Sequence, residues 1–353
     1  MSVITIRSNV LDYTVHFQDN ADFVEGFSRF TQRLFVIDES VWQLHGHGCL
    51  SSIPESERMI FPICEERKNL DSVMEIYDRL MQSSAKKNMT LISIGGGIIQ
   101  DITGFVASTL YRGLNWVFVP TTLLAQADSC IGSKTSLNYK RFKNILGTFY
   151  PPSEVHIYAP FLQTLAKGDF LSGMGEVAKL HIMGGTDTAA ALTAALPAIL
   201  GRDKDSLLSA IRRSLAIKLS YMEGDEFDTG RRNLLNYGHC FGHALETVCH
   251  YAIPHGQAVV VGMLVANRTA VQRGLLSAVN DQRLAKQLLA SLLDFKLDLS
   301  IYSTTELIAA MKQDKKRIGE GLVMVMITDS MELVKADDVT PEEVELALAG
   351  SFE

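Results

Sequence analysis

The sequence lacks the features that mark secreted or membrane-spanning proteins. Its five cysteines are scattered over 353 residues without a CxxC pair, which favours reduced thiols over a disulfide framework. No apolar run reaches the ~18 residues that a membrane span requires. The first residues also lack the charged head and apolar core of a signal peptide. We therefore expect a cytoplasmic protein without a membrane partner.

Positive charge is scarce as well. The formal net charge is −7, and no block of Lys and Arg stands out. Because a duplex-binding surface needs basic residues to displace counterions, we expect no nucleic-acid partner. The sequence does have ample core material, since 47% of its residues are hydrophobic. This length exceeds a usual single-core domain, which predicts two domains.

The two halves of the chain differ in their hydrophobic pattern. The first half predicts buried strands at 34–37, 90–94 and 116–119, with helices over 70–81 and 98–110 between them. This alternation indicates a parallel sheet with crossover helices. From about residue 171 the pattern is helical, with one apolar strand at 322–327; the expected helices are 174–181, 189–200, 206–222, 234–248, 257–272 and 281–293. We place the domain boundary near residue 168.

Glycines 95–97 lie between a predicted strand and a predicted helix. A phosphate can approach bare backbone N–H groups at such a helix N-terminus. The triplet is not a GxGxxG motif, so a turn that merely joins two elements is an equal alternative. Asp101 follows in the first helical turn, where an acid is favourable whatever its role. The triplet alone therefore indicates a nucleotide site only weakly.

Polar residues gather just after the third predicted strand. Thr121, Thr122, Gln126 and Asp128 lie where open α/β sheets bind their ligands. We expect the residues that follow to form a polar loop, with Lys134, Asn138, Lys143 and Asn144. This loop is either an ordinary solvated segment or an anion-binding mouth, and we favour the second interpretation.

The strongest local pattern is a pair of histidines in the helix expected at 234–248. His239 and His243 are four residues apart, so they share one helix face, which Arg232 and Asn236 extend towards the N-terminus. Gly238 and Gly242 each cost a helix roughly 1 kcal/mol, which indicates that another backbone approaches closely there.

A third imidazole and a carboxylate would complete a catalytic zinc site. His255 lies in a Pro-His-Gly turn before the next helix, and Glu176 is the best carboxylate candidate. Two histidines plus a carboxylate leave one zinc position open for substrate. The alternative is a set of core histidines with satisfied hydrogen bonds. The pattern also leaves open whether His243 binds metal or transfers protons.

These motifs together resemble 3-dehydroquinate synthase, of the sugar-phosphate cyclase superfamily. The resemblance runs from about Asp38 to Ile327. It rests on the glycine triplet with Asp101, Arg112-Gly113, the Pro-Thr-Thr-Leu-Leu segment ending at Asp128, Lys134 with Asn138, Lys143-Asn144, Glu176 with Lys179, the run at 236–243, and His255-Gly256. It implies an N-terminal α/β nucleotide-binding domain with a parallel sheet at 1–168, and a mostly helical metal- and substrate-binding domain at 169–353.

The resemblance also implies roles for individual residues. The zinc or cobalt ligands would be Glu176, His239 and His255, and the catalytic residues His243, Asp228, Lys179 and Asp128. NAD would be held by Asp38, Glu65, Lys68, Gly95, Gly96, Gly97, Asp101, Thr121, Thr122, Lys143 and Thr164. The sugar phosphate would meet Lys134, Asn144, Lys218, Arg232, Asn236 and Lys316, and Arg112 from the other subunit of a homodimer.

The implied reaction converts a seven-carbon 2-keto acid sugar phosphate (DAHP) into 3-dehydroquinate with loss of phosphate, through transient oxidation by NAD. Lys218 and Arg232 suit the substrate carboxylate. The departures from the family pattern are Gln100, Ser133, Leu180, Asp228 and Gln257. They would suit a paralogous cyclase of a secondary pathway. A metal-dependent alcohol dehydrogenase and a degenerate binding protein are further alternatives.

The basic run at 314–317, which includes Lys316, is usually a solvated face. Its position before a glycine turn and an apolar strand leaves a phosphate-binding role open.

Overall fold

The computed structural model describes residues 3–140, 142–296, 302–312 and 321–349. The chain forms two compact units, residues 1–165 and 166–353. The division lies three residues before the boundary at 168 expected from the sequence. Lys316 and the rest of the basic run at 314–317 lie outside the described residues.

The N-terminal unit is built on a seven-stranded sheet of order β1-β2-β9-β6-β5-β3-β4. Its strands are β1 (Val3–Ile6), β2 (Tyr13–Phe17), β3 (Arg33–Asp38), β4 (Arg58–Phe61), β5 (Thr90–Gly95), β6 (Asn115–Pro120) and β9 (Glu154–Ile157). Every neighbouring pair is parallel except β1 and β2, which are antiparallel. The predicted parallel sheet is confirmed, and the antiparallel edge is an addition to it.

The central strands are apolar on both faces because other elements cover both. All of β5 is buried, and so is β6 after its first residue. Phe35 and Ile37 of β3 pack into a core with Val41 of α1 (Glu39–His45) and with Phe27. The crossover helices α2 (Leu70–Gln82) and α3 (Gly97–Thr109) match the predicted ones. Near-continuous apolar runs are typical of parallel strands buried in this way.

The stretch expected to be a polar loop is instead a β-hairpin. Strands β7 (Lys134–Tyr139) and β8 (Phe142–Phe149) pair antiparallel. Thr135 and Leu137 alternate with more exposed residues and are buried, and β7 packs on α3. The loop prediction is therefore wrong. Every second residue of β7 is buried, as in a strand, but most of its residues are polar, so the sequence does not show the alternation clearly.

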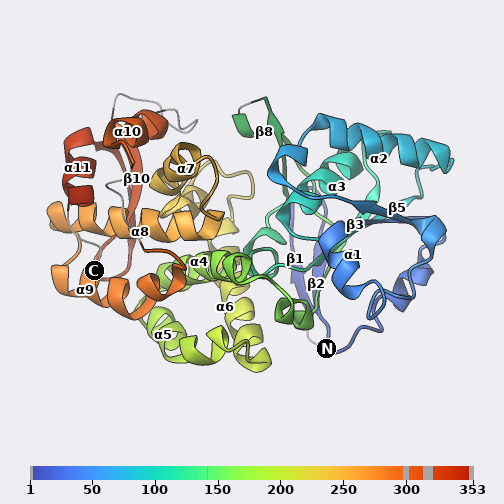
Figure 1. The fold of residues 1–353 in the computed structure, drawn as a ribbon, viewed down its shortest axis with the longest axis horizontal. Helices are drawn as coiled ribbons and strands as arrows, with labels where there is room; N and C mark the ends of the chain where they lie inside the picture. Colours follow the sequence, from blue (N-terminus) through green and yellow to red (C-terminus); the bar gives the residue numbers. More distant parts are fainter. Residues whose placement is uncertain (1–2, 141, 297–301, 313–320, 350–353) are drawn as a thin grey trace. The chain divides into compact units, whose positions relative to one another are not determined.

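The C-terminal unit is mainly helical, as predicted. Its helices are α4 (Lys167–Met183), α5 (Thr186–Leu200), α6 (Lys204–Met222), α7 (His239–Val248), α8 (His255–Gln272), α9 (Ala278–Leu284), α10 (Thr304–Lys312) and α11 (Pro341–Ala349). The predicted strand is β10 (Leu322–Ile327), which pairs antiparallel with β11 (Leu333–Val339). Figure 1 shows α8 crossing the middle of this unit, and both α4 and α7 pack against it.

The expected helix over 234–248 starts later than predicted. A short 3-10 helix covers Arg231–Asn236, Gly238 has a φ of 77°, and α7 begins only at His239. The chain therefore turns sharply between Asn236 and His239. Arg232 and Asn236 consequently do not extend the helix face of the two histidines. Among the described residues, no helix is long and apolar enough to cross a membrane.

Candidate metal centre and cofactor site

Glycines bring the backbones of α4 and α8 together beside two of the predicted metal ligands. A Cβ on Gly175 would lie 2.1 Å from the carbonyl oxygen of Gly256, and one on Gly256 would lie 1.7 Å from that of Ser172. The Gly256 N–H donates to the Ser172 hydroxyl at 2.9 Å. Only glycine permits this approach. The crossing therefore places Glu176, next to Gly175, beside His255, next to Gly256.

The third expected ligand is positioned in the same way. Gly238 precedes His239, and a Cβ on it would lie 2.6 Å from the carbonyl oxygen of Val259 in α8. Its left-handed φ of 77° also favours glycine. At Gly242 a Cβ would lie 3.0 Å from the carbonyl oxygen of Ala258. The close approach expected from the cost of these glycines is confirmed, and α8 is the element that approaches.

The predicted ligands converge on one carboxylate oxygen. Glu176 is 1% exposed, and its Oε1 lies 3.3 Å from His255 Nε2 and 3.5 Å from His239 Nε2. Its Oε2 lies 2.5 Å from the ammonium of Lys179, one turn further along α4. A buried carboxylate, a buried ammonium and two imidazoles thus occupy one small region.

The donor set fits a divalent cation. Neither carboxylate oxygen of Glu176 has a hydrogen bond of good geometry, although Lys179 and both imidazoles are near. A buried carboxylate is normally fully hydrogen-bonded, since an unsatisfied one is costly. Two imidazole nitrogens and a carboxylate oxygen are also preferred zinc ligands. We conclude that the arrangement of these three residues is suited to a metal ion.

His243 belongs to the same cluster. Among the described residues, the ligand atoms of His239, His243 and His255 lie within 4.8 Å of one another. The His243 ring centroid is 5.2 Å from that of His239 and 5.8 Å from that of His255. His243 is the exposed member of the three. His243 thus lies next to the candidate metal ligands. From this position it could either bind a metal or transfer a proton, the two roles that the sequence left open.

Burial and neighbouring charges shift the pKa values of these residues strongly. Burial would raise the pKa of Glu176, but Lys179 and the two histidines together hold it well below its usual range. Burial and the nearby Lys179 lower the pKa of His239 well below normal. Burial also opposes the charge on His255, yet Glu176 and Glu246 outweigh it and raise the pKa to about 10. Glu176 therefore lies among groups that favour its ionised form.

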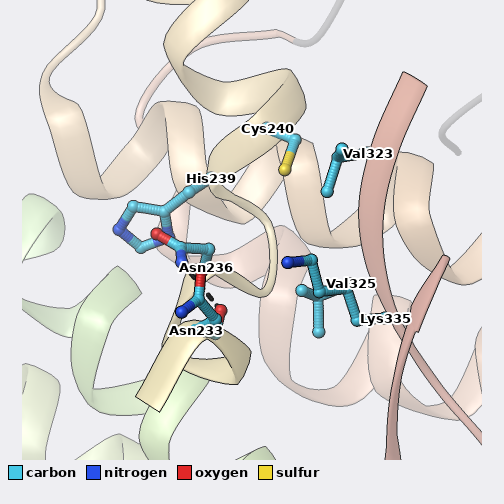
Figure 2. Close-up of a pocket in the computed structure, with 7 residues that line it drawn as sticks. All are labelled: Asn233, Asn236, His239, Cys240, Val323, Val325 and Lys335. Carbon is cyan, nitrogen blue, oxygen red and sulfur yellow. Dashed lines mark hydrogen bonds between the residues drawn. The ribbon is translucent and has the colours of Figure 1, made fainter. Parts of the chain in front are cut away.

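A pocket lies on the other side of His239. It contains about 290 Å³ of space, part of it open to solvent, and is lined by Asn233, Asn236, His239, Cys240, Val323, Val325 and Lys335. Figure 2 shows the imidazole of His239 directed away from β10, whereas Cys240 points towards Val323. Glu176, His243 and His255 do not line this pocket. Two of the three candidate ligands, Glu176 and His255, therefore lie outside this pocket.

The segment before α7 carries three expected site residues on an organised turn. Both carboxylate oxygens of Asp225 accept hydrogen bonds, from the N–H groups of Thr229, Gly230 and Arg232 at 2.8 Å and from the Thr229 hydroxyl at 3.0 Å. Asp228 has a left-handed φ of 61°. Arg232 is 4% exposed and its guanidinium donates to the Glu226 carbonyl oxygen. Asn236 donates to the Asn233 carbonyl oxygen.

Lys218 belongs to the helix that packs against this segment. It lies on α6 and is 7% exposed. Arg231 connects the segment to α6, since it donates to the Ser220 carbonyl oxygen at 3.1 Å and stacks over Tyr221. Two buried cationic side chains, Lys218 and Arg232, therefore come from neighbouring elements.

In the N-terminal unit, the expected cofactor residues lie at a topological switch point. From β3 the chain passes outwards to β4 and returns to the other side of β3 as β5. Open α/β sheets bind ligands at the carboxyl ends of strands where the order reverses in this way. Asp38 ends β3 and caps α1 by accepting from the Ser40 N–H at 2.8 Å. A Cβ on Gly95, which ends β5, would lie 3.0 Å from Cβ of Asp38.

Asp101 lies in the second turn of α3, one turn later than expected, and is held by an ion pair with Lys68 and by the β7–β8 hairpin. Lys68 Nζ lies 2.6 Å from Asp101 Oδ2 and donates to Asn144 Oδ1 at 2.7 Å. Ser136 donates to Asp101 from both its N–H, at 3.0 Å, and its hydroxyl, at 2.9 Å. Asn144, expected to meet the substrate phosphate, thus lies among expected cofactor residues, with a left-handed φ of 53°.

A second ion pair extends this cluster. Lys143 Nζ lies 3.4 Å from Glu65 Oε1, which also accepts from Asn138 at 2.8 Å. These residues of the hairpin and of the segment before α2 come together as expected. The threonines have structural hydrogen bonds: Thr121 N–H donates to Gly95, Thr122 accepts from the Ala125 N–H, and Thr164 contacts His45 at 2.9 Å.

The remaining predicted residues lie in varied settings. Arg112 is exposed and left-handed, with a φ of 60°, and it follows Tyr111 at 51°. Lys87 holds this strained turn by donating to the carbonyl oxygens of Tyr111 and Gly113. Lys134 is exposed at the start of β7. Asp128 is half-buried in a helical turn after β6.

Three departures from the family pattern have structural explanations. Gln100 donates to the Ser129 carbonyl oxygen and accepts from its hydroxyl, both at 2.7 Å. Ser133 has a φ of 64°, which explains why glycine is usual there. Gln257 is fully buried and accepts from the Asp294 N–H at 3.2 Å. These residues serve packing and turns in their own units.

Sequence reasoning missed two side chains that contact site residues. Ser136 accounts for two of the hydrogen bonds to Asp101, and Glu246 Oε2 lies 3.2 Å from Nδ1 of His255. Glu246 could have been found, since residues 239, 243 and 246 share one face of a helix. Ser136 carries no such signal, because it depends on how the hairpin packs.

The chain is similar in sequence to known proteins over most of its length. Residues 58–172 match the family model described as 3-dehydroquinate synthase N-terminal, and residues 173–317 match the one described as 3-dehydroquinate synthase C-terminal. A 3-dehydroquinate synthase from Geotalea uraniireducens is 40% identical over 265 residues, which are 75% of this chain and 73% of that protein. One from Streptococcus equi is 32% identical over 334 residues, 92% of this chain and 91% of its own.

Solved structures share the architecture. A 2-epi-5-epi-valiolone synthase from Streptomyces hygroscopicus, solved with NAD+ and Zn2+ bound, has a TM-score of 0.85 and 25% identity and covers 98% of each chain. A glycerol dehydrogenase from Schizosaccharomyces pombe has a TM-score of 0.66 at 14% identity, over 97% of this chain and 89% of its own. The second likeness concerns the fold alone.

Proposed function

This chain belongs to the 3-dehydroquinate synthase family, and from that premise we propose that it converts DAHP into 3-dehydroquinate with loss of phosphate. In this proposal it is a phosphate-eliminating carbon–oxygen lyase that requires NAD and a divalent metal. The observation that carries the proposal is the convergence of His239 and His255 on Oε1 of the buried Glu176, at 3.5 and 3.3 Å.

Three residues would hold the metal, and the residues around them would handle charge and protons. When bound, a Zn2+ ion supplies polarisation of substrate oxygens, and NAD supplies a reversible redox step. Glu176, His239 and His255 would be the ligands. Lys179, 2.5 Å from Glu176, would keep that carboxylate ionised and offer an N–H to a substrate oxygen. His243, exposed beside the cluster, would move a proton as acid or base.

The substrate carboxylate would bind to buried cations. Lys218 and Arg232 are 7% and 4% exposed and come from packed neighbouring elements. Arg can bind a carboxylate through two parallel hydrogen bonds, and Lys adds a point charge. Asp225 fixes the backbone of Arg232, Asn236 ends the same 3-10 helix, and Asp228 lies just before it. Retention of this pair supports a keto-acid substrate over a sugar phosphate that lacks a carboxylate.

The N-terminal unit would bind NAD at the switch point between β3 and β5. Asp38, the glycines 95–97 and the pair Lys68–Asp101 lie at or beside the carboxyl ends of these strands. Glu65, Lys143 and the threonines 121, 122 and 164 complete the proposed set. The phosphate of the substrate would meet Lys134, Asn144 and Lys316 together with Arg112 of a second subunit. Arg112 is exposed, so its side chain is accessible to a second subunit.

The location of the protein is also part of the proposal. All five cysteines are free thiols. Free thiols suit a reducing compartment, so we propose the cytoplasm.

Phosphate release from a panel of sugar phosphates tests the proposal. The purified chain, with NAD and Zn2+, is expected to release phosphate from DAHP, to stop when the metal is chelated and to recover when Zn2+ is returned. No NADH should accumulate, because the cofactor is restored in each turnover. Absence of phosphate release from DAHP with both cofactors present would contradict the proposal.

The panel also separates the alternatives. Preference for sedoheptulose 7-phosphate, which has no carboxylate, would favour a different cyclase of the same superfamily. Arg232→Lys should distinguish these cases, because it would raise KM for DAHP and leave KM for the sugar phosphate without a carboxylate unchanged. Net formation of NADH would instead favour an alcohol dehydrogenase.

A further inference from the structure

Glu246 is a second carboxylate beside His255, on the side of the ring that faces away from Glu176. It lies on α7 at the third position after His243 and the seventh after His239, and it is 7% exposed. Its Oε2 lies 3.2 Å from Nδ1 of His255. Nε2 of the same ring lies 3.3 Å from Glu176 Oε1. The His255 ring is therefore placed between two carboxylates, with one nitrogen towards each.

Both ring nitrogens of His255 face a carboxylate, and Nε2 is the one directed at the other proposed ligand, Glu176. A metal bound through the lone pair of Nε2 leaves the ring proton on Nδ1. Glu246 then accepts the hydrogen bond from that N–H. Metal-binding histidines commonly donate their other N–H to a carboxylate, which fixes the ring and strengthens the ligand.

The position of His255 increases its need for such a partner. It is the first residue of α8, directly after the cap residue Pro254. Its side chain is about one-third exposed, whereas that of Glu176 is 1% exposed. Contact with Glu246 restrains this less enclosed ring, because Glu246 itself is held within α7.

We propose that Glu246 is a positioning residue of the metal centre, which holds His255 with Nδ1 protonated and Nε2 directed at the metal. The inference rests on the metal centre of the proposed function and adds a residue to it. Glu246 touches neither substrate nor cofactor in this role and acts through His255.

The test measures metal binding by the full-length protein in the absence of substrate. Zinc affinity is measured by competition with a chromophoric chelator for the unchanged protein and for Glu246→Ala, Glu246→Asp and Glu246→Gln. Loss of such a carboxylate typically weakens metal binding by about 10- to 100-fold, and we expect that loss in the Ala variant. The Asp variant should lose a similar factor because its shorter side chain cannot reach Nδ1. The Gln variant should lose less, since its amide oxygen still accepts the hydrogen bond.

Spectra and a control variant complete the design. With Co2+ as a probe, the visible absorption bands should shift in the Ala and Asp variants, because His255 is no longer held in place. Glu223→Ala, which removes an exposed acid at the end of α6, should leave affinity and spectrum unchanged. Circular dichroism checks folding, and if the Ala variant does not fold, the comparison of Asp with Gln decides.

Zinc affinity equal to that of the unchanged protein in the Ala and Asp variants would overturn the proposal. An equal loss in the Gln and Asp variants would overturn it too, because the retained acceptor would then have no effect. These outcomes are independent of turnover. A protein that binds zinc in this graded way but releases no phosphate from DAHP would contradict the proposed function alone.

Discussion

Each unit contains a polar cluster built around a carboxylate, Asp101 in the N-terminal unit and Glu176 in the C-terminal unit. The two carboxylates differ in how many hydrogen bonds they accept. In the N-terminal unit, Asp101 accepts from Lys68 and twice from Ser136. In the C-terminal unit, Glu176 has Lys179, His239 and His255 nearby, yet neither of its oxygens has a well-aligned hydrogen bond. The first cluster is complete by itself, whereas the second gains most from an ion. The comparison teaches that hydrogen-bond satisfaction separates a self-sufficient polar cluster from a cluster suited to a metal ion.

The largest expected effect comes from separating α4 from α8. Gly175→Ala would place a methyl group 2.1 Å from the Gly256 carbonyl oxygen. Overpacking of this kind costs typically ~1–3 kcal/mol, and the required shift would also part Glu176 from His255. We expect loss of zinc binding and of phosphate release, measured by metal analysis and the phosphate assay.

Gly168→Ala is the matched control in the same helix. A Cβ there would lie 3.6 Å from Oδ2 of Asp294, an ordinary contact. It should keep zinc and activity. Full zinc binding by Gly175→Ala would show that the glycine crossing does not position the ligands.

The next effect separates the histidines by role. His239→Ala should lose metal and turnover together, because it removes a proposed ligand. His243→Ala should keep its metal and lose turnover, by about 100- to 10,000-fold if it acts in proton transfer. Metal content per chain and kcat measure the two quantities. If His243→Ala loses metal as His239→Ala does, then the three-imidazole set is the ligand set.

A smaller effect is expected from a substitution in the N-terminal cluster, where Asp101 already accepts hydrogen bonds from Lys68 and Ser136. Lys68→Ala would leave Asp101 with Ser136 alone, and removal of one partner of a buried polar group costs ~1–3 kcal/mol. We expect weaker NAD binding, measured by fluorescence titration, with unchanged zinc affinity. Lys143→Ala should lower the free energy of unfolding by less than Lys68→Ala does. The ion pair of Lys143 with Glu65 is longer, at 3.4 Å, and more exposed than that of Lys68 with Asp101. Loss of zinc binding in Lys68→Ala would break the distinction between the clusters.

The sequence predicted elements and residue types better than turns. The β5–α3 and β6 elements could be predicted because apolar runs and glycine punctuation are local signals. The start of α7 could not, because the left-handed turn at Gly238 depends on how α8 approaches. The hairpin carrying Ser136 and Asn144 was hidden for a related reason, since its buried side chains pack on α3, far away in sequence.

The same limit applies to the candidate site. The histidine spacing and Glu176 were enough to predict a metal cluster, and the resemblance supplied its members. The hydrogen bond from His255 to Glu246 and the placement of Asn144 beside Lys68 needed tertiary geometry. Residues that act through a neighbour leave a weaker pattern in the sequence than those that bind a ligand themselves.

The smallest expected effect concerns Asp225, a carboxylate of the C-terminal unit whose hydrogen bonds come from neighbouring backbone N–H groups. Burial would raise the pKa of Asp225, but the N–H groups of Thr229, Arg232 and Gly230 lower it to about 2 from 3.8. A lowered folded-state pKa stabilises the fold above pH 3.8, and this contribution is lost as the pH falls towards 2. In Asp225→Asn an amide N–H2 would face N–H donors. The variant should therefore be less stable than the unchanged protein at pH 7, and this difference should shrink at pH 3. Urea unfolding at both pH values measures it, with the exposed Asp205→Asn as control. A difference that stays constant between pH 7 and pH 3 would mean that the charge of Asp225 does not organise the turn that carries Arg232.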